Sequence, residues 1–240
     1  MDESRAPGAL YVVGTPIGNL EDITLRALRV MKEAAVIAAE DTRHTQKLLS
    51  HFQFHTPLTS YHDFNKETKA PVLVARMIEG GSVALVSDAG MPTISDPGYF
   101  LINRCIDAGI RVVPVPGPSA VMAALTASGL PTDAFHFEGF LPKPSGRLGR
   151  RLEALREYPG TIVLFESPQR LLKTLTAIAA AWGNRRAVVA RELTKIHEEW
   201  LRGPIEDLIA DIERRPRRGE ITLLVEGRRE RPLREAPALD

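Results

Sequence analysis

The chain contains 240 residues, of which 44% are hydrophobic and 25% are charged. Such a chain can bury a sizeable core, and its length suffices for one large domain or two small ones. No run of about 20 apolar residues is present, which argues against a membrane-spanning helix. Residues 1–13 contain neither a basic nor a long apolar region, so no secretion signal is expected. The single cysteine, Cys105, lies in an apolar pattern and is expected to be a buried thiol in a cytoplasmic protein.

The formal net charge is only +1, so the field of the whole molecule does not attract a polyanion. Nucleic-acid binding would therefore need a local basic patch. Residues 143–156 hold five basic residues against one acidic residue, and eight arginines follow from position 214 onward. Each stretch is either a binding surface or simply a solvated surface.

Short apolar runs alternate with amphipathic stretches in the first half of the chain. The runs have the pattern of buried strands and comprise residues 10–13, 36–39, 83–86 and 112–115. Residues 22–34 and 68–79 have the pattern of amphipathic helices, and Asp22 is expected to cap the first. This alternation predicts βαβ units, hence a parallel sheet with helices on both faces.

The pattern changes at residues 114–119, where three prolines and a glycine predict a stiff turn. A helix is expected over 120–128, and further strands over 136–139, 162–165, 188–191, 199–201 and 221–225. Pro168 and Pro204 suit the first turns of helices, and antiparallel pairing is expected near the C-terminus. We therefore predict an α/β fold with two α/β domains, a parallel-sheet domain over 9–118 and a mixed-sheet domain over 119–227. A disordered tail is expected over 228–240.

Two loops after predicted strands are candidates for ligand binding, because open α/β folds bind ligands at the carboxyl ends of their strands. Residues 14–20 (GTPIGNL) match neither a Walker loop nor a GxGxxG motif, so this loop alone is a weak signal. Residues 86–98 pack two glycines, two prolines and two aspartates into a constrained loop. This second loop suits a small polar ligand such as a nucleoside that carries an amino acid. Asp96 is expected to cap the following helix, with Pro97 at its first position.

Charged residues follow other predicted strands at positions 40–43, 166–170 and 191–195, with His197 close behind. Each is either an ionic link at a domain edge or part of a site. No metal site is predicted, because one cysteine cannot form a thiolate cluster and the six histidines are interpreted as lacking HxxxH and HxH spacing. A serine hydrolase is not favoured, since the Gly-x-Ser-x-Gly turn is missing.

Taken together, these loops resemble the ordered motifs of the ribosomal RNA small subunit methyltransferase I family, within the tetrapyrrole-methylase superfamily. The motifs run from about position 9 to 227 and read GTPIGNL, AEDTR, SYHDFN, LVSDAGMPTISDPG, VPVPGPSA, FEGFLP, ESPQRL, RELTK and GEITLLVEG. In one position the chain departs from the family pattern, since Lys66 stands where family members carry a glutamate.

The resemblance implies the tetrapyrrole-methylase (class III methyltransferase) fold and a homodimer. It also implies S-adenosylmethionine-dependent 2′-O-methylation of a cytidine in the decoding region of 16S rRNA, with the donor bound between the two domains. The positions that match the donor pocket of the superfamily are Pro16, Gly90, Met91, Pro92, Ile94, Ser119, Ala120, Phe165, Ala190 and Ile221. Most are apolar, which suits the loss of charge on sulfur during methyl transfer.

The acceptor hydroxyl must also lose a proton, and a well-placed base typically contributes a factor of about 10²–10⁴ to the rate. The candidate bases are Asp88, Lys195, His62 and Glu192, of which Asp88 is favoured because it lies in the donor loop. For the RNA, bidentate phosphate contacts are expected from Arg43 and Arg170. The basic stretch adds Lys143, Arg147, Arg150 and Arg151.

Two other functions are compatible with the same sequence. A methylase of this fold could act on a tetrapyrrole or on a protein side chain, although the basic stretch mildly favours RNA. A non-catalytic ribosome-binding module is the other alternative, and the departure at Lys66 is its only support.

Overall fold

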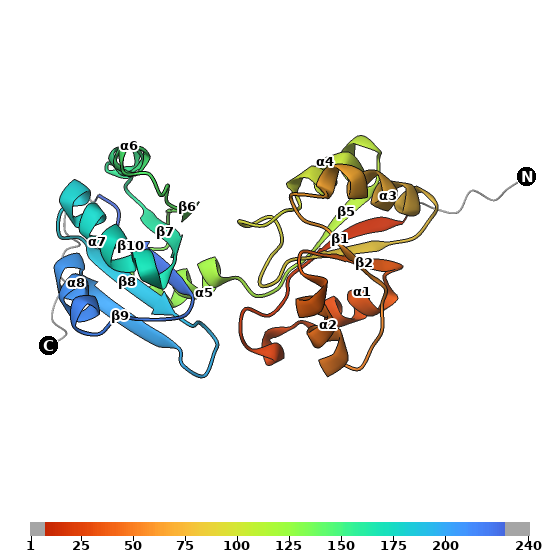
Figure 1. The fold of residues 1–240 in the computed structure, drawn as a ribbon, viewed down its shortest axis with the longest axis horizontal. Coiled ribbons are helices and arrows are strands. Elements are labelled where there is room, and N and C mark those ends of the chain that lie inside the picture. The colour runs from red at the N-terminus through yellow and green to blue at the C-terminus, as the bar shows by residue number, and fades with distance from the viewer. Residues whose placement is uncertain (1–7, 229–240) are drawn as a thin grey trace, which may run out of the picture. The chain divides into compact units, whose positions relative to one another are not determined.

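The computed structural model describes residues 8–228. The chain divides into two compact units between Ala120 and Val121, and each is described separately below (Figure 1). The tail expected to be disordered lies outside the described residues, apart from Arg228. Within the described residues, no helix is both long and apolar enough to cross a membrane.

The first unit is built on a parallel sheet, as predicted. Its strands are β1 (Ala9–Val13), β2 (Val36–Ala39), β3 (Leu58–Ser60), β4 (Val83–Val86) and β5 (Arg111–Val115). They lie in the order β3-β2-β4-β1-β5, and every neighbouring pair is parallel. The carboxyl ends of all five strands therefore lie at one edge of the sheet.

Helices cover both faces of this sheet (Figure 1). They are α1 (Leu25–Glu33), α2 (Thr42–His51), α3 (Lys66–Ile78) and α4 (Tyr99–Asp107). Because side chains alternate along a strand, Ile37 packs with α1 and α2 while Val36 packs with α3 and α4. Cys105 is fully buried in the second of these cores, as predicted, and burial raises the pKa of its thiol to about 11.

The first helix starts later than predicted. Asp22 lies in a separate 3₁₀ turn (Leu20–Asp22), and the cap of α1 is Thr24, whose hydroxyl accepts a hydrogen bond from the N–H of Ala27 at 3.0 Å. The prediction that Asp22 caps this helix was therefore wrong. The backbone has to turn twice after β1, and this moves the helix start to the next residue able to cap it.

The second unit contains the mixed sheet that the sequence predicts. Helix α5 (Ala120–Ser128) leads into it, and its strands are β6 (Phe135–Phe140), β7 (Thr161–Glu166), β8 (Arg186–Arg191), β9 (Glu199–Pro204) and β10 (Ile221–Val225). The order is β6-β7-β10-β8-β9; only β6 and β7 are parallel, and the other pairs are antiparallel.

Three helices pack on one face of the mixed sheet and enclose a single apolar core. They are α6 (Ser145–Leu155), α7 (Pro168–Trp182) and α8 (Ile205–Arg214). Pro168 occupies the first turn of α7, as predicted. Pro204 is instead the N-cap of α8, one position before the first turn, because β9 continues to this residue.

Candidate active site

The candidate site of the first unit is formed by the loops that follow its five strands. Two of these loops approach each other closely. A Cβ atom on Gly14 would lie 2.8 Å from the Cα of Gly117, and one on Gly117 would lie 2.9 Å from the Cα of Gly14. Neither position has room for a side chain, so the glycines allow the loops after β1 and β5 to meet.

The loop after β4 is joined to the same cluster. Thr15 and Gly90 exchange two backbone hydrogen bonds of 3.0 Å, and the Thr15 hydroxyl donates to the carbonyl of Ser87 at 3.2 Å. Gly90 has φ +80°, a left-handed conformation that favours glycine. The Gly-Pro-rich segments of the sequence thus build one rigid arrangement of backbone.

Strain marks the second half of this loop. Thr93 and Ser95 have φ angles of 74° and 76°, which are rare for residues with a side chain, particularly a β-branched one. Backbone strain of this kind costs about 1–3 kcal/mol per residue and is concentrated at functional sites. The strained residues immediately precede Asp96 and fix its position.

Asp96 does not cap helix α4, so this prediction was wrong. The N-cap is Gly98, which offers no side chain, and the Asp96 carboxyl instead interacts with the hydroxyl of Ser87. Burial raises the pKa of Asp96 to about 6, the Ser87 hydrogen bond opposes this rise, and the nearby Asp88 adds to it.

Asp88 is half-buried at the end of β4, where its Oδ1 accepts a hydrogen bond from the backbone N–H of Asp41 at 3.0 Å. Glu40 lies beside it at the end of β2. Burial raises the pKa of Glu40, and the negative charges of Asp96 and Asp88 raise it further. Carboxyl groups from two adjacent central strands thus converge at this edge.

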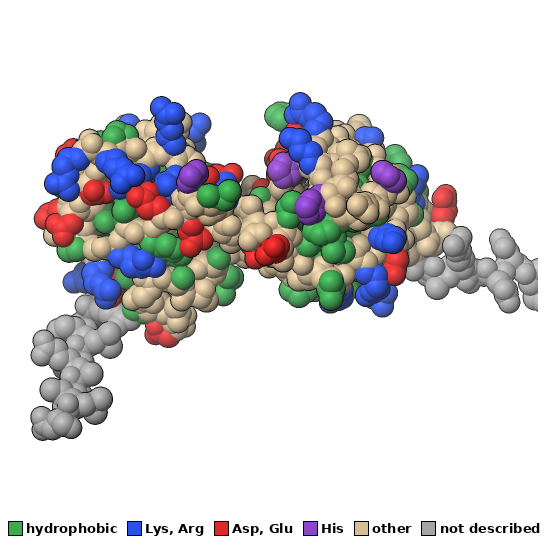
Figure 2. Space-filling model, turned by 90° about the horizontal axis from the view of Figure 1, so that it is seen from below, with side chains coloured by type: hydrophobic (Ala, Val, Ile, Leu, Met, Phe, Trp, Pro, Cys, Tyr) green, Lys and Arg blue, Asp and Glu red, His purple; other side chains and the backbone are tan. Residues whose placement is uncertain are grey.

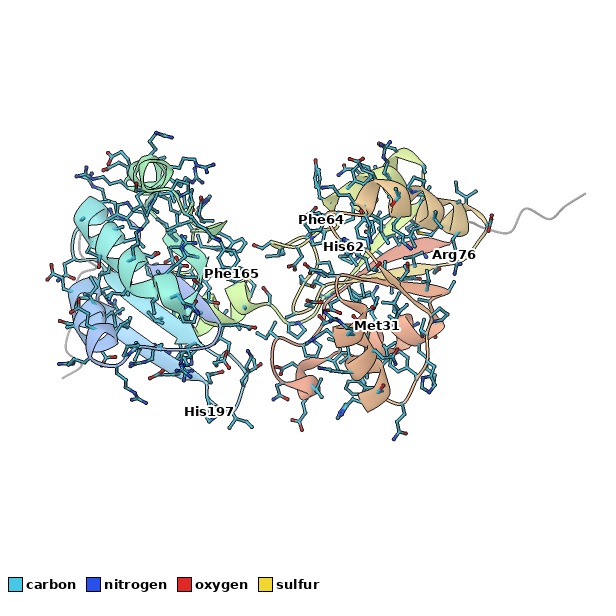
Figure 3. The ribbon with its side chains drawn as sticks, viewed as in Figure 1. Met31, His62, Phe64, Arg76, Phe165 and His197 are labelled. Atoms are coloured by element: carbon cyan, nitrogen blue, oxygen red, sulfur yellow. The ribbon has the colours of Figure 1, made fainter. Side chains whose placement is uncertain are left out.

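His62 follows the edge strand β3 in a loop closed by Asn65. The Asn65 side chain accepts from the N–H of His62 at 2.9 Å, donates to the carbonyl of Ser60 at 3.2 Å, and lies 3.2 Å from Nε2 of His62. The Nδ1 atom of His62 is buried without a hydrogen-bond partner. The ring is therefore positioned by its loop (Figure 3).

The two candidate bases of the second unit form an ion pair. Lys195 contacts Glu192 at 3.0 Å and Glu220 at 3.1 Å. Burial alone would lower the pKa of Lys195, but its two carboxylate partners outweigh burial and raise it. The N–H of Glu220 and the Lys195 ammonium lower the pKa of Glu192. Lys195 is therefore held protonated and Glu192 ionised, so the structure favours neither as a general base.

The expected donor-pocket residues divide between the two units. Those at the carboxyl edge of the first sheet or next to it are Pro16, Gly90, Met91, Pro92, Ile94, Ser119 and Ala120. Ile94 has a 42% exposed side chain, which gives this edge an apolar surface.

In the second unit, Phe165 and Ala190 lie on one row of the sheet, each paired with Thr222 of the central strand β10. Ile221 does not share their face. Its side chain belongs to the core beneath α6–α8, because neighbouring residues of a strand point to opposite faces. A donor contact by Ile221 stays a prediction, and it would have to come from the backbone of this residue because its side chain lies in the core. Thr222 is the residue of β10 that shares a row with Phe165 and Ala190.

The expected phosphate-binding arginines have different surroundings. Arg43 is 87% exposed and pairs with Asp41 at 2.6 Å. Arg170 donates to the carbonyl of Leu141 at 2.9 Å and lies 3.6 Å from the buried Glu166. Its guanidinium thus supports the second unit, and a phosphate contact by Arg170 stays a prediction.

On α6, Arg151 is similarly occupied, since it makes two hydrogen bonds to Glu138 of β6. Lys143, Arg147 and Arg150 are exposed. They are the members of the basic stretch that remain candidates for binding RNA. Figure 2 shows basic and acidic side chains interspersed over the visible surface, in keeping with the net charge of +1.

The interpretation that the histidines lack HxxxH spacing was wrong, because His51 and His55 are four residues apart, a spacing that can bind metal on a helix. Helix α2 ends at His51, so the two residues are not on one helical face. Among residues 8–228, no group of three or more histidine, cysteine or acidic residues is placed to hold a metal ion.

Residues 9–209 match the family model of the tetrapyrrole (corrin/porphyrin) methylases. The chain is also 51% identical to the ribosomal RNA small subunit methyltransferase I of Halalkalibacterium halodurans, over 93% of this chain and 78% of the relative. The chain belongs to this methyltransferase family. A relative of the same name from Thermotoga maritima is 47% identical to this family member, over 92% of the chain and 99% of the relative.

Solved structures of the tetrapyrrole methylases have the same fold as this family member. Uroporphyrin-III-C-methyltransferase from Thermus thermophilus matches with a TM-score of 0.63 and 25% identity, over 91% of this chain and 94% of that one. A second structure of this enzyme, in complex with S-adenosyl homocysteine, matches with a TM-score of 0.63 and 20% identity, over 90% and 97% of the two chains.

Proposed function

We propose that this protein transfers a methyl group from S-adenosylmethionine to the ribose 2′-hydroxyl of a cytidine in the decoding region of 16S rRNA. The observation that carries the proposal is the 51% identity to a ribosomal RNA small subunit methyltransferase I over 93% of the chain. The proposal further includes a homodimer and, because the substrate is a ribosomal particle, a cytoplasmic protein.

The edge of the first sheet suits S-adenosylmethionine, which supplies a methyl group on a positively charged sulfur. Gly90 and its neighbours present backbone groups held in place by Thr15, and Ile94 offers exposed apolar surface. Backbone amides and carbonyls can bind the polar parts of the donor, while apolar side chains exclude water around the sulfur. We assign Pro16, Gly90, Met91, Pro92, Ile94, Ser119 and Ala120 to the donor, and Phe165 and Ala190 as further contacts.

Asp88 is our choice for the group that accepts the proton of the 2′-hydroxyl. One of its oxygens is fixed by the N–H of Asp41, so the carboxylate has a defined direction. Glu40 and Asp96 surround it with negative charge. A carboxylate that is held in a defined direction beside the donor loop can take a proton from a hydroxyl placed within hydrogen-bond reach. His62 is the alternative base in this unit.

Binding of the RNA backbone is assigned to Arg147 and Arg150 on α6, to Lys143 just before this helix, and to Arg43 in the first unit. Their exposed cationic groups can neutralise phosphates, which makes affinity strongly dependent on salt. The paired Arg151 and Arg170 are left out, because their hydrogen bonds hold the protein together.

The second candidate function is methylation of a tetrapyrrole, because solved structures of uroporphyrin-III methyltransferases share this fold. Radiolabelled S-adenosylmethionine should distinguish the two. We expect label in the RNA of isolated 30S particles and none in uroporphyrinogen III. Label in the tetrapyrrole alone would replace the proposed substrate. Binding of the donor without transfer to either would leave a non-catalytic ribosome-binding protein.

A further inference from the structure

Phe64 is an aromatic residue that is almost completely exposed to solvent. Its exposure is 99%, although it lies in an ordered loop directly after β3. Exposed apolar side chains are common, but a full phenyl ring displayed on a constrained loop has no structural role of its own. Figure 3 shows the ring beside His62, with which it makes an edge-type contact at 6.0 Å between ring centroids.

The loop that displays Phe64 is tightly held. The hydrogen bonds of Asn65 close it at both ends, and Lys66 contacts Asp63 at 2.9 Å. A ring that is already ordered loses little conformational freedom when it binds a partner. The exposed phenyl group is therefore preorganised.

The loop also belongs to the edge of the sheet that carries the candidate base. β3 pairs in parallel with β2, so its carboxyl end lies beside Glu40. The charge of Asp63 contributes to the raised pKa of Glu40, which places the loop within electrostatic reach of the carboxylates. The first turn of the following helix carries two lysines: Lys66 pairs with Asp63, and Lys69 donates to the hydroxyl of Thr59.

We propose that Phe64 stacks on a nucleobase of the acceptor strand, next to the nucleotide that is methylated. Single-stranded RNA is recognised by aromatic rings that stack on unpaired bases, with nearby cations for the phosphates. In this proposal the ring of Phe64 stacks on the base, and Lys66 and Lys69 contact the phosphates. This inference rests on the proposed function, because it requires RNA as the substrate.

The test compares Phe64→Leu, Phe64→Trp and a matched control, Ile78→Ala. Ile78 is also an exposed apolar residue, 56% exposed, but lies at the opposite end of α3. Methyl transfer to 30S particles gives KM and kcat for each variant, and calorimetry gives the affinity for S-adenosylmethionine. We expect about a tenfold rise in KM for Phe64→Leu, and near-normal values for Phe64→Trp and Ile78→Ala. Donor affinity should not change.

The Phe64→Trp variant adds a direct measurement, because its new indole should be quenched when RNA binds. An active wild type with an unchanged KM in Phe64→Leu would overturn the inference and leave the proposed function standing. Loss of self-association in Phe64→Leu at normal RNA affinity would also overturn the inference, because Phe64 would then contact a second copy of the chain. A wild type that does not methylate RNA would overturn both.

Discussion

The carboxylate of Asp88, at the end of β4, accepts a hydrogen bond from the backbone N–H of Asp41, at the end of β2, over 3.0 Å. These two strands are neighbours in the middle of the parallel sheet. The bond fixes the direction of one carboxyl group relative to a second strand. It also brings the charge of Asp88 close to Glu40 and Asp96, whose pKa values it raises.

Replacing Asp88 by asparagine removes the proton acceptor and keeps the oxygen that receives the Asp41 hydrogen bond. We expect kcat for methyl transfer to fall by about 10²–10⁴-fold with unchanged affinity for S-adenosylmethionine. Asp22→Asn, an exposed acid in the 3₁₀ turn after β1, serves as the control and should retain normal kcat. Near-normal turnover in Asp88→Asn would move the base to His62.

Asp96 should make the stability of the protein depend on pH. Its pKa is about 6 in the folded protein and 3.8 as an unperturbed group. The folded state therefore binds this proton more tightly, so the contribution of Asp96 to stability should rise as pH falls from 6 toward 4. Asp96→Asn lacks this ionisation and should be more stable than wild type at pH 8 by about 1 kcal/mol, after allowance for solvent screening.

Denaturant unfolding at pH 8 and pH 4 measures this difference. The advantage of Asp96→Asn should disappear at pH 4, where the wild-type carboxyl is largely protonated in the folded state. An equal difference in unfolding free energy between the two proteins at pH 8 and pH 4 would show that ionisation of Asp96 does not destabilise the fold.

Lys195 is expected to act as a fixed cation. Lys195→Arg keeps the positive charge between Glu192 and Glu220 and should retain most of the activity. Lys195→Met leaves both carboxylates without a cation and should destabilise the loop between β8 and β9. If Lys195 were the general base, Lys195→Arg would lose its activity, because arginine does not release its proton near neutral pH. Complete loss of kcat in a folded Lys195→Arg variant would restore Lys195 as a candidate base.

Gly117 should not tolerate a methyl group. In Gly117→Ala the new Cβ would lie 2.9–3.0 Å from backbone atoms of Gly14, so the loops after β1 and β5 must separate. We expect a loss of about 1–3 kcal/mol in unfolding free energy, and weaker donor binding. Gly149→Ala is the matched control. It lies within α6 with no atom within 4 Å of the added Cβ, and should be neutral or slightly stabilising. Equal stability of the two variants would contradict the packing described here.

The central strands could be predicted most closely because they are buried on both faces and read as continuous apolar runs. β2, β4 and β10 have the predicted bounds. β3 and α2 were missed for related reasons. β3 is a three-residue edge strand that is only half-buried, and α2 is so polar that its sequence resembles a charged loop.

The loops near the donor were identified from glycine and proline, whose conformational limits can be read locally. The ion-pair partners and protonation states of the charged residues could not be predicted in this way, because their partners are distant in sequence. Glu138 binds Arg151, and Glu220 binds Lys195 across 25 positions. Asp96 illustrates the same limit. Its position before a helix suggests a cap, but the strained loop turns it toward Ser87.

The most direct test of the central claim identifies the methylated atom. Wild-type protein and Asp88→Asn would be incubated with radiolabelled S-adenosylmethionine and isolated 30S particles, and the 16S rRNA would then be hydrolysed with alkali. Alkali cleaves RNA through a free 2′-hydroxyl, so a methylated ribose survives as a dinucleotide. The account predicts wild-type label in an alkali-resistant dinucleotide that yields 2′-O-methylcytidine, and a much slower appearance with Asp88→Asn. Label in a methylated base, or equal rates for the two proteins, would contradict it.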